Sequence, residues 1–390
     1  MILPKIILIT NSFIFLFREF MTRIKNTHLA CLFLTSISFS TFASVDDINN
    51  KPQFVVISLD DGVNQEMEKS VAQLNSTIPL TFYVNVVQQA GGWVYEESML
   101  DIVCVNDDGL TTGDPQCVSN PKSINNLYKK GHEFALHTYS HPAIASGNQG
   151  EPLTQAQIEK ELKKNYEFLV ASGIPGDKIK GFRAPFLDTN SSGWDRENKN
   201  AALGHLQGIM NQLNISYDSS LSAAPEQTQP RKGVRHCTSI PGGWDNVHCD
   251  FSQKEQFNWE DGGYPKYTVA TQPKSNQLFM GYKYIDGSIV NVMDTVFGAC
   301  NQTCTPEQAK NIWMENFLNH YKDASRPPFG IYLHRQSLSI SDEVDGLNAF
   351  IKEVQLEYPN TYFVTASQVS DYYKIGVDLT PEQIKAFLSK

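Results

Sequence analysis

Short apolar runs alternate with helical patterns along most of this 390-residue chain. Such alternation is typical of α/β folds, in which strands and helices follow one another along the sequence. We predict strands at 54–57, 80–87, 133–137, 180–183, 215–217, 289–293, 330–333 and 362–365. We predict helices at 66–74, 122–129, 154–171 and 305–321, with a short last helix from Thr380. The two longest begin with capping boxes, Thr154-x-x-Gln157 and Thr305-x-x-Gln308. The pattern therefore predicts one α/β domain with elaborated loops.

Polar side chains stand at the carboxyl ends of four of these predicted strands. They are Asp60-Asp61-Gly62, the stretch 137–141, the stretch 183–186 and His334. In α/β folds the carboxyl ends of the strands open on one face, so residues far apart in the sequence converge there. One such stretch is weak support, but four in the same structural position predict a functional site that includes His334 as a catalytic residue.

The adjacent carboxylates Asp60 and Asp61 indicate distinct roles for the two side chains. Neighbouring carboxylates repel each other, which a cation near one and an arginine near the other would relieve. His137 and His141 supply two imidazoles, and Pro142 disfavours helical geometry at His141. No Glu follows His137, so this is not the HExxH arrangement of metalloproteases. We predict that Asp61, His137 and His141 bind a divalent metal with positions left open for water; the alternative is a solvated turn.

The ordered motifs resemble those of the polysaccharide deacetylases, carbohydrate esterase family 4. They are SLDDG at 58–62, HTYSH at 137–141, RAPF at 183–186 and YLH at 332–334. Their order and spacing match across roughly the whole chain after residue 43. Within the family, the chain is most similar to chitin deacetylases of the arthropod type. That similarity lies in YDSSL at 217–221, FLNHY at 317–321, SRPPFGIYLH at 325–334 and TYFVTASQVSDYY at 361–373.

The resemblance implies a distorted (β/α) barrel that binds one divalent metal, usually zinc. It implies that Asp61, His137 and His141 are the metal ligands. The implied activity is the metal-dependent removal of acetyl groups from N-acetylglucosamine units of chitin or chitooligosaccharides. The partner that we expect is therefore an acetylated glycan.

The same resemblance implies roles for residues around the metal. Asp60 would be the general base, and Arg183 would hold it ionised and oriented. The backbone N–H of Phe186 would help to bind the oxyanion, and His334 would protonate the leaving amine. The aspartate–tryptophan motif that the family carries after the RAPF stretch is not recognisable here, and the stretch YDSS stands in its place. Asp218 in that stretch is the candidate for orienting His334.

Two segments, 91–120 and 223–277, interrupt the alternation and are rich in Gly, Pro, Asn and Asp. They predict long ordered insertions, of the kind that shape a binding face. Four tryptophans lie in loop-like segments: Trp93, Trp194, Trp244 and Trp259. Because aromatic faces stack on pyranose rings, we predict that one or two of them line sugar subsites; ordinary loop packing is the alternative.

Residues 1–43 have the features of a cleaved signal peptide. Arg23 and Lys25 precede an apolar core at 29–42, which ends in Thr41-Phe42-Ala43. Met21 is an alternative start, which would place residues 1–20 outside the protein. A membrane anchor is the alternative, but each apolar run is shorter than the roughly 20 residues of a spanning helix. We therefore predict a secreted or periplasmic protein with no stable membrane anchor after cleavage, whose catalytic domain spans 44–390.

Six cysteines remain after residue 43. An even number in an exported chain indicates disulfides, and nearest-neighbour pairing predicts 104–117, 237–249 and 300–304. These short loops would pin the insertions. The alternative is zinc: His236-Cys237 and His248-Cys249 could supply a two-Cys, two-His site, and Cys300 and Cys304 also have a spacing that suits metal ligands. We favour disulfides, because thiols pair in an oxidising compartment.

The chain carries 42 acidic and 32 basic residues, for a net charge of −10. A nucleic-acid binder normally has the opposite balance, so we expect no nucleic-acid partner. Apolar residues at 41% and charged residues at 19% argue against a disordered or polytopic membrane protein. Two alternatives to chitin deacetylation stay open. One is the same chemistry on peptidoglycan, another acetylated glycan or an O-acetyl ester, and the other is a catalytically silent chitin-binding protein.

Overall fold

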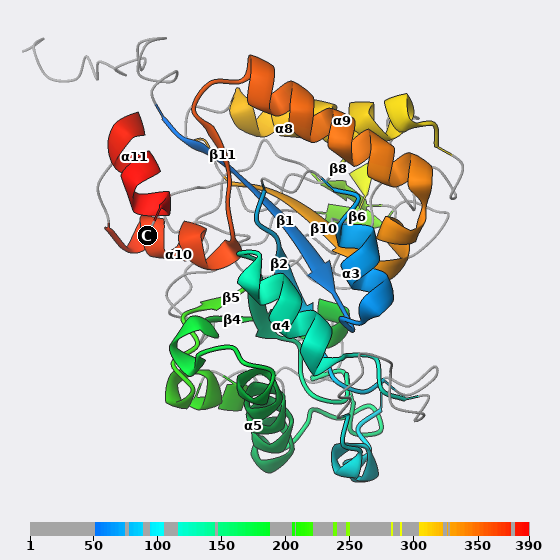
Figure 1. The fold of residues 1–390 in the computed structure, drawn as a ribbon. Helices are drawn as coiled ribbons and strands as arrows, with labels where there is room; N and C mark the ends of the chain where they lie inside the picture. The colour runs from blue at the N-terminus through cyan, green and yellow to red at the C-terminus, as the bar shows by residue number, and fades with distance from the viewer. Residues whose placement is uncertain are drawn as a thin grey trace, which may run out of the picture. The chain divides into compact units, whose positions relative to one another are not determined.

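The computed structural model describes residues 51–74, 78–88, 94–104, 116–144, 147–187, 205–206, 208–220, 304–322, 326, 328–375 and 379–389, and the backbone of four short strands between 237 and 290. Its main feature is a seven-stranded parallel sheet in the order β10-β1-β2-β3-β4-β5, with β11 also paired to β1 (Figure 1). These strands are β1 Gln53–Asp60, β2 Thr81–Val84, β3 Glu133–Leu136, β4 Gly181–Phe182, β5 Tyr217–Asp218, β10 Phe329–His334 and β11 Thr361–Phe363. The predicted α/β class is confirmed, and the barrel takes the form of a parallel half-barrel.

Strand β1 is the centre of the sheet. It pairs with β10 from Val55 to Asp60 and with β2 from Ser58 to Asp60. It pairs with β11 through Gln53–Val55. Because Val55 has partners in both β10 and β11, β11 must join the edge that β2 uses further along the strand. The two strands that come last in the sequence, β10 and β11, therefore both pair with β1, the first strand.

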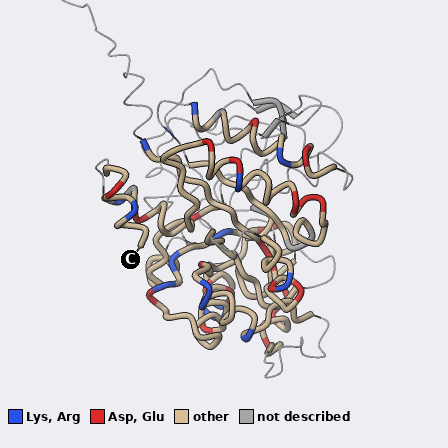
Figure 2. Tube along the Cα trace, turned by 45° about the horizontal axis from the view of Figure 1, so that its top comes forward, with Lys and Arg blue, Asp and Glu red and all other residues tan. Residues whose placement is uncertain are grey.

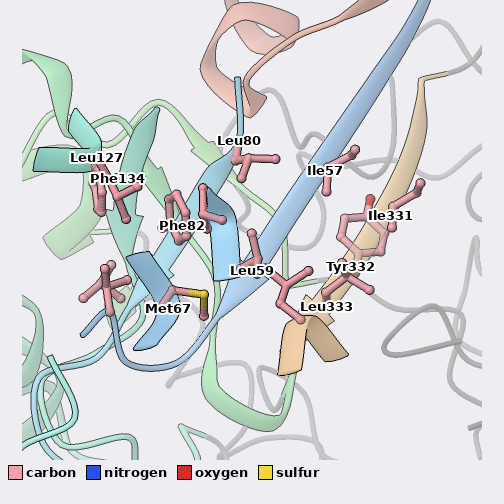
Figure 3. Close-up of a cluster of buried hydrophobic side chains, with 14 of the residues drawn as sticks. Ile57, Leu59, Met67, Leu80, Phe82, Leu127, Phe134, Ile331, Tyr332 and Leu333 are labelled. Atoms are coloured by element: carbon pink, nitrogen blue, oxygen red, sulfur yellow. The ribbon is translucent and has the colours of Figure 1, made fainter. Parts of the chain in front are cut away.

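Side chains alternate between the two faces of this sheet, as the pleat requires. The odd-numbered residues of β1 from Val55 to Leu59 belong to the larger hydrophobic cluster (Figure 3). The even-numbered residues from Phe54 to Asp60 lie on the other face, which we call the inner face, where Phe54 and Val56 join a second cluster. The register places Tyr332 beside Ser58 and His334 beside Asp60, so both belong to the inner face as well.

Helices contribute side chains to both hydrophobic clusters. The larger cluster contains side chains of α3 Gln65–Val71, α4 Pro121–Lys129, α5 Gln155–Ala171, α8 Pro306–Tyr321 and α9 Ser341–Glu357. The second cluster contains side chains of α10 Ala366–Ile375 and α11 Pro381–Leu388. Four short 3-10 helices complete these elements: η2 Glu97–Asp101, η3 Gly176–Lys178, η4 Pro185–Leu187 and η5 Arg335–Ser339. The capping boxes predicted for α5 and α8 are confirmed.

Helix α9 lies where the sequence analysis predicts no helix. Its N-cap position is Ile340, whose side chain caps nothing, so the usual signal of a helix start is missing. Gly346 also lies in its interior, where glycine is unfavourable by about 1 kcal/mol. A Cβ at Gly346 would lie 2.6 Å from the Cβ of Ala309 in α8. Tertiary packing of α9 against α8 therefore outweighs its weak local signals.

The first insertion carries the predicted disulfide between Cys104 and Cys117, whose Cα atoms are 5.7 Å apart. Both cysteines are buried in a small cluster with Val86, Val87, Met99, Leu100 and Tyr139. Cys304 is disulfide-bonded too, and its partner lies outside the described residues. The alternative of a zinc site that uses Cys304 as a thiolate is therefore wrong.

Four short strands lie outside the main sheet, two of them in the second insertion and two just after it. β6 Cys237–Ser239 pairs with β7 Val247–Cys249, and this antiparallel register places Cys237 opposite Cys249. Such a position is compatible with the predicted 237–249 disulfide, whose sulfur atoms lie outside the described residues. β8 Tyr282–Lys283 pairs with β9 Ile289–Val290. The strand predicted at 289–293 thus belongs to a separate two-stranded sheet.

Acidic and basic residues are interspersed along the described part of the chain (Figure 2). Within that part, no helix has the length and apolar character needed to cross a membrane. The signal peptide predicted at 1–43 lies outside the described residues, so it stays a prediction.

Candidate metal centre and active site

The structure brings the three predicted metal ligands together at the carboxyl end of the sheet. Asp61 follows β1, and His137 and His141 follow β3. One ligand atom from each of the three lies within 4.8 Å of the others. His141 Nε2 is 3.2 Å from Asp61 Oδ1, and His137 Nε2 is 4.0 Å from the same oxygen. Two imidazole nitrogens and one carboxylate oxygen therefore converge on one point.

Left-handed backbone conformations make this convergence possible. A straight continuation of β1 would send Asp60 and Asp61 to opposite faces of the sheet. Asp61 instead has a φ of 78°, and Thr138 and His141 have φ values of 64° and 62°. Such conformations are unfavourable for residues other than glycine, and they concentrate at functional sites. Gly62 continues the turn where a Cβ would lie only 2.3 Å from the carbonyl oxygen of Val118.

Protonation states suit the ligand set. The Nδ1–H of His137 donates to the carbonyl oxygen of Arg183 at 2.7 Å, which leaves the Nε2 lone pair free. Burial lowers the pKa of His137 to about 4, although Asp60 opposes the shift, so the imidazole is neutral at pH 7. Burial opposes the ionisation of Asp61, but His141, His334 and His137 outweigh it and hold its pKa below the ordinary range. Imidazole nitrogens and a carboxylate oxygen are ligands that zinc accepts.

Asp60 forms a buried ion pair with Arg183. Arg183 Nη1 donates to Asp60 Oδ1 at 2.5 Å, and the two residues are 1% and 3% exposed. The guanidinium also donates to Ser58 Oγ at 3.1 Å and, through Nη2, to Ser219 Oγ at 2.6 Å. The orientation of Asp60 that the sequence motifs predict thus has a direct structural basis.

Two tyrosines flank the Arg183 guanidinium, and the sequence analysis does not identify either. The carbon Cζ of Arg183 lies 3.9 Å from the ring centroid of Tyr83 and 4.7 Å from that of Tyr332. Contacts of this kind stabilise a cation and fix its plane. Gly330 leaves room for the second ring, because a Cβ there would lie 2.3 Å from the Tyr332 hydroxyl. The signal was the alternation along β2 and β10, which places both tyrosines on the inner face, Tyr83 beside Asp60 and Tyr332 beside Ser58.

His334 and Phe186 also lie at this end of the sheet. The register of β1 and β10 pairs His334 with Asp60, and the charge of His334 contributes to the low pKa of Asp61. Phe186 has a φ of 56°, and its ring centroid is 4.8 Å from that of His141. Its side chain is 58% exposed, which is unusual for an aromatic ring. The oxyanion role of its N–H stays a prediction.

Asp218 is fully buried at the end of β5. Its Oδ1 accepts hydrogen bonds from the N–H of Ser220, at 2.8 Å, and from the Ser220 hydroxyl. That hydroxyl accepts in turn from the N–H of Ala184 at 2.8 Å. Burial raises the pKa of Asp218 to about 6 against the effect of the Ser220 bonds. Through Ser220, Asp218 thus fixes the backbone at Ala184, next to Arg183. Its role in orienting His334 stays a prediction.

Two polar residues of α5, Glu161 and Asn165, are fully buried and bond the loop that carries the histidines. Neither residue is among those predicted from the sequence. Their spacing of four residues on the buried side of a helix is the signal, since polar side chains there need partners.

The four tryptophans predicted to line sugar subsites lie outside the described residues. They are Trp93, Trp194, Trp244 and Trp259, and their role stays a prediction.

Part of the chain matches the model of a known protein family. Residues 47–202 match the family model described as polysaccharide deacetylase. Chitin deacetylase 1 of Bombyx mori is 21% identical over 271 residues, which are 64% of this chain and 42% of that protein. The match therefore spans less than half the length of this relative.

Two solved structures align with most of the chain. A putative polysaccharide deacetylase from Mycobacterium smegmatis aligns over 84% of this chain and 92% of its own, with 15% identity and a TM-score of 0.44. The peptidoglycan deacetylase PdaC from Bacillus subtilis aligns over 83% of this chain and 93% of its own, with 11% identity and a TM-score of 0.38.

Proposed function

We propose that the protein is a metal-dependent hydrolase that removes acetyl groups from N-acetylglucosamine units of chitin or chitooligosaccharides, and the match of residues 47–202 to the polysaccharide deacetylase family model supports this proposal. The observation that carries the proposal is the convergence of Asp61, His137 and His141 beside the buried pair of Asp60 and Arg183. The choice of chitin rests on the similarity to the Bombyx mori chitin deacetylase.

The residues present fit a divalent metal, most simply zinc. Asp61 Oδ1 is buried and makes no hydrogen bond among the described residues, which is the condition of a ligand atom. Asp61, His137 and His141 would hold the ion. Bound there, zinc would polarise the amide carbonyl and lower the pKa of a water molecule towards about 7.

The chain's own residues would carry the proton transfers. Asp60 would accept a proton from the attacking water, and Arg183 would keep the carboxylate aimed at it as a positioning residue. The N–H of Phe186 would donate to the carbonyl oxygen as negative charge develops there. When the carbon–nitrogen bond breaks, His334 would give a proton to the departing nitrogen. The products would be acetate and a free glucosamine amine.

The proposal also covers how a longer glycan is bound and where the protein acts. One or two of Trp93, Trp194, Trp244 and Trp259 would stack on sugar rings beyond the residue that is deacetylated. Cleavage after residue 43 would release the catalytic domain, residues 44–390, outside the cytoplasmic membrane. Without residues 1–43, which carry four basic residues and one acidic residue, the net charge would be −13, which suits a neutral or cationic glycan better than an anionic one.

Acetate release from chitooligosaccharides by the purified protein tests this function. We expect release that a chelator abolishes, that added zinc restores, and that Asp60→Asn eliminates. Asp177→Asn, at an exposed aspartate of η3, is the matched control and should keep wild-type activity. Release from peptidoglycan or from an O-acetyl ester alone would change the substrate. Chitin binding without any release would favour the silent binding protein, and absence of both activity and bound metal would refute the site.

A further inference from the structure

The loop that carries both histidines has an unfavourable backbone conformation that its own hydrogen bonds do not stabilise. Thr138 and His141 are in the left-handed region, with φ values of 64° and 62°, and neither is glycine. Each such residue costs about 1–2 kcal/mol unless its surroundings enforce the conformation. Within the loop, the N–H of His141 donates to Thr138 Oγ1 at 3.1 Å. That single bond leaves the N–H groups between the two histidines to be satisfied from outside the loop.

Glu161 of α5 satisfies two of these groups, those of Tyr139 and Ser140. Its Oε2 accepts hydrogen bonds from the N–H of Tyr139 and from the N–H of Ser140, each at 2.8 Å. Its Oε1 accepts from the Ser140 hydroxyl. One carboxylate thus binds two consecutive backbone donors and one side-chain donor. Hydrogen bonds to a buried carboxylate are stronger than neutral ones, so this is a firm attachment between the helix and the loop.

Asn165, one helical turn further on, extends the same attachment. Its Oδ1 accepts from the N–H of His137 at 3.3 Å, and its Nδ2 donates to the carbonyl oxygen of Val84 in β2 at 2.8 Å. Helix α5 therefore holds the loop at His137, Tyr139 and Ser140.

The two histidines depend on this attachment to different degrees. The ring of His137 is fixed directly, because its Nδ1–H donates to the carbonyl oxygen of Arg183. The Nδ1 of His141 is buried and has no hydrogen-bond partner among the described residues. No hydrogen bond at Nδ1 fixes the His141 ring, so its direction depends on packing against the rings of His137 and Phe186 and on its backbone, which Glu161 holds through the preceding residue.

We propose that Glu161 is a positioning residue for the metal centre, which acts by holding the backbone of Tyr139 and Ser140 so that His141 faces Asp61. This inference rests on the metal site proposed above. Glu161 is not itself a ligand, because both of its oxygens are engaged by the loop. A fully buried carboxylate is costly in a hydrophobic core, and acceptance of three hydrogen bonds at this loop is what would retain it.

Metal affinity, measured by competition with a chelator of known affinity, tests the proposal. Glu161→Leu removes every acceptor and should weaken zinc binding by about 10–100-fold, as loss of partners that orient ligands does. Glu161→Gln should stay within about 3-fold of wild type. Its amide oxygen can accept from both N–H groups, and the Ser140 hydroxyl can rotate to accept from the amide nitrogen. If Glu161→Leu does not fold, Glu161→Asp replaces it, because this variant withdraws the carboxylate from the loop by one methylene. The same weakening of zinc binding is expected.

Glu133 offers a matched control for loss of stability. It is a second buried glutamate, at the other end of β3, and it accepts from Thr81 Oγ1 at 2.9 Å and from the Tyr217 hydroxyl at 2.8 Å. Glu133→Leu should lower the melting temperature yet leave zinc affinity within about 3-fold of wild type. The visible absorption of the cobalt-substituted protein should change in Glu161→Leu and not in Glu133→Leu.

The outcomes separate this inference from the proposed function. Wild-type protein that binds zinc, together with a folded Glu161→Leu of unchanged affinity and cobalt spectrum, would overturn the role of Glu161 alone. Equal weakening by Glu133→Leu would also overturn it, because affinity would then follow stability. A wild-type protein that binds no divalent metal would refute the metal site itself.

Discussion

The buried pair of Arg183 and Asp60 permits a quantitative test of how the site is held together. Removing one partner of such a pair leaves an uncompensated buried charge, which costs about 3–5 kcal/mol. Arg183→Met keeps an apolar stem between the rings of Tyr83 and Tyr332 but removes the charge. Asp60→Asn keeps the shape of the carboxylate without its charge. If the two charges acted independently, the double variant would lose about 6–10 kcal/mol, the sum of the single losses.

We expect the double variant to lose much less than that sum. With both charges removed, no unpaired charge stays in the core, so the coupling free energy should be at least about 2 kcal/mol. Urea unfolding followed by circular dichroism gives the four free energies of unfolding. All four proteins are measured with a chelator present, because a metal that binds only the folded state would add its own stabilisation.

An exposed pair provides the control. Glu159 and Lys163 lie four residues apart on α5 with partly exposed side chains. The same cycle there should give a coupling of about 0.5 kcal/mol or less. A coupling of that size for Arg183 and Asp60 would refute the reasoning, since it would show that each charge is satisfied without the other.

Three further predictions concern the scaffold. Burial lowers the pKa of His132 from 6.5 to about 4. As the pH falls, the unfolded chain therefore takes up the proton before the folded protein does. The stabilising contribution of neutral His132 is lost between about pH 6.5 and pH 4. The stability difference between wild type and His132→Gln should shrink by about 2–3 kcal/mol from pH 7 to pH 4.5 in urea unfolding, and a constant difference would contradict the assignment. Replacing Cys104 and Cys117 together by serine should cost about 3 kcal/mol, and a loss below about 1 kcal/mol would show that packing alone holds the insertion. Gly181→Ala places a Cβ 2.0 Å from Cζ of Tyr217 and should cost about 1–3 kcal/mol in the same measurement, whereas Gly208→Ala, which meets nothing within 4 Å, should cost little.

Much of the sheet and of its polar edge could be predicted from the sequence. The strands are short apolar runs, and β1, β3 and β10 end at Asp60, just before His137, and at His334. Strand ends are where a parallel sheet gathers its functional residues, so placing these side chains required no knowledge of the pairing order. The order β10-β1-β2 itself has no local signal, because it depends on which edges meet in the folded chain.

The parts that escaped prediction depend on tertiary contacts. The interior Gly346 of α9 weakens its helix signal, and the contact with Ala309 that explains it joins segments far apart along the chain. Glu161 shows the same limit. A glutamate in an amphipathic helix predicts an exposed position, and only the folded loop supplies the three donors that make burial favourable. Tyr83 differs, because the alternation along β2 was enough to place it on the inner face.

The position of β1 between early and late strands has a consequence for synthesis. A chain made from its amino terminus completes Asp61, His137 and His141 well before β10 exists, so the ligand set is present while β1 still lacks a neighbour along one edge. An unpaired apolar strand edge recruits other chains. A nascent or truncated chain that ends before Phe329 should therefore keep the three ligands, lack His334, and aggregate. Until β10 and β11 are synthesised, chaperones would have to prevent such chains from associating.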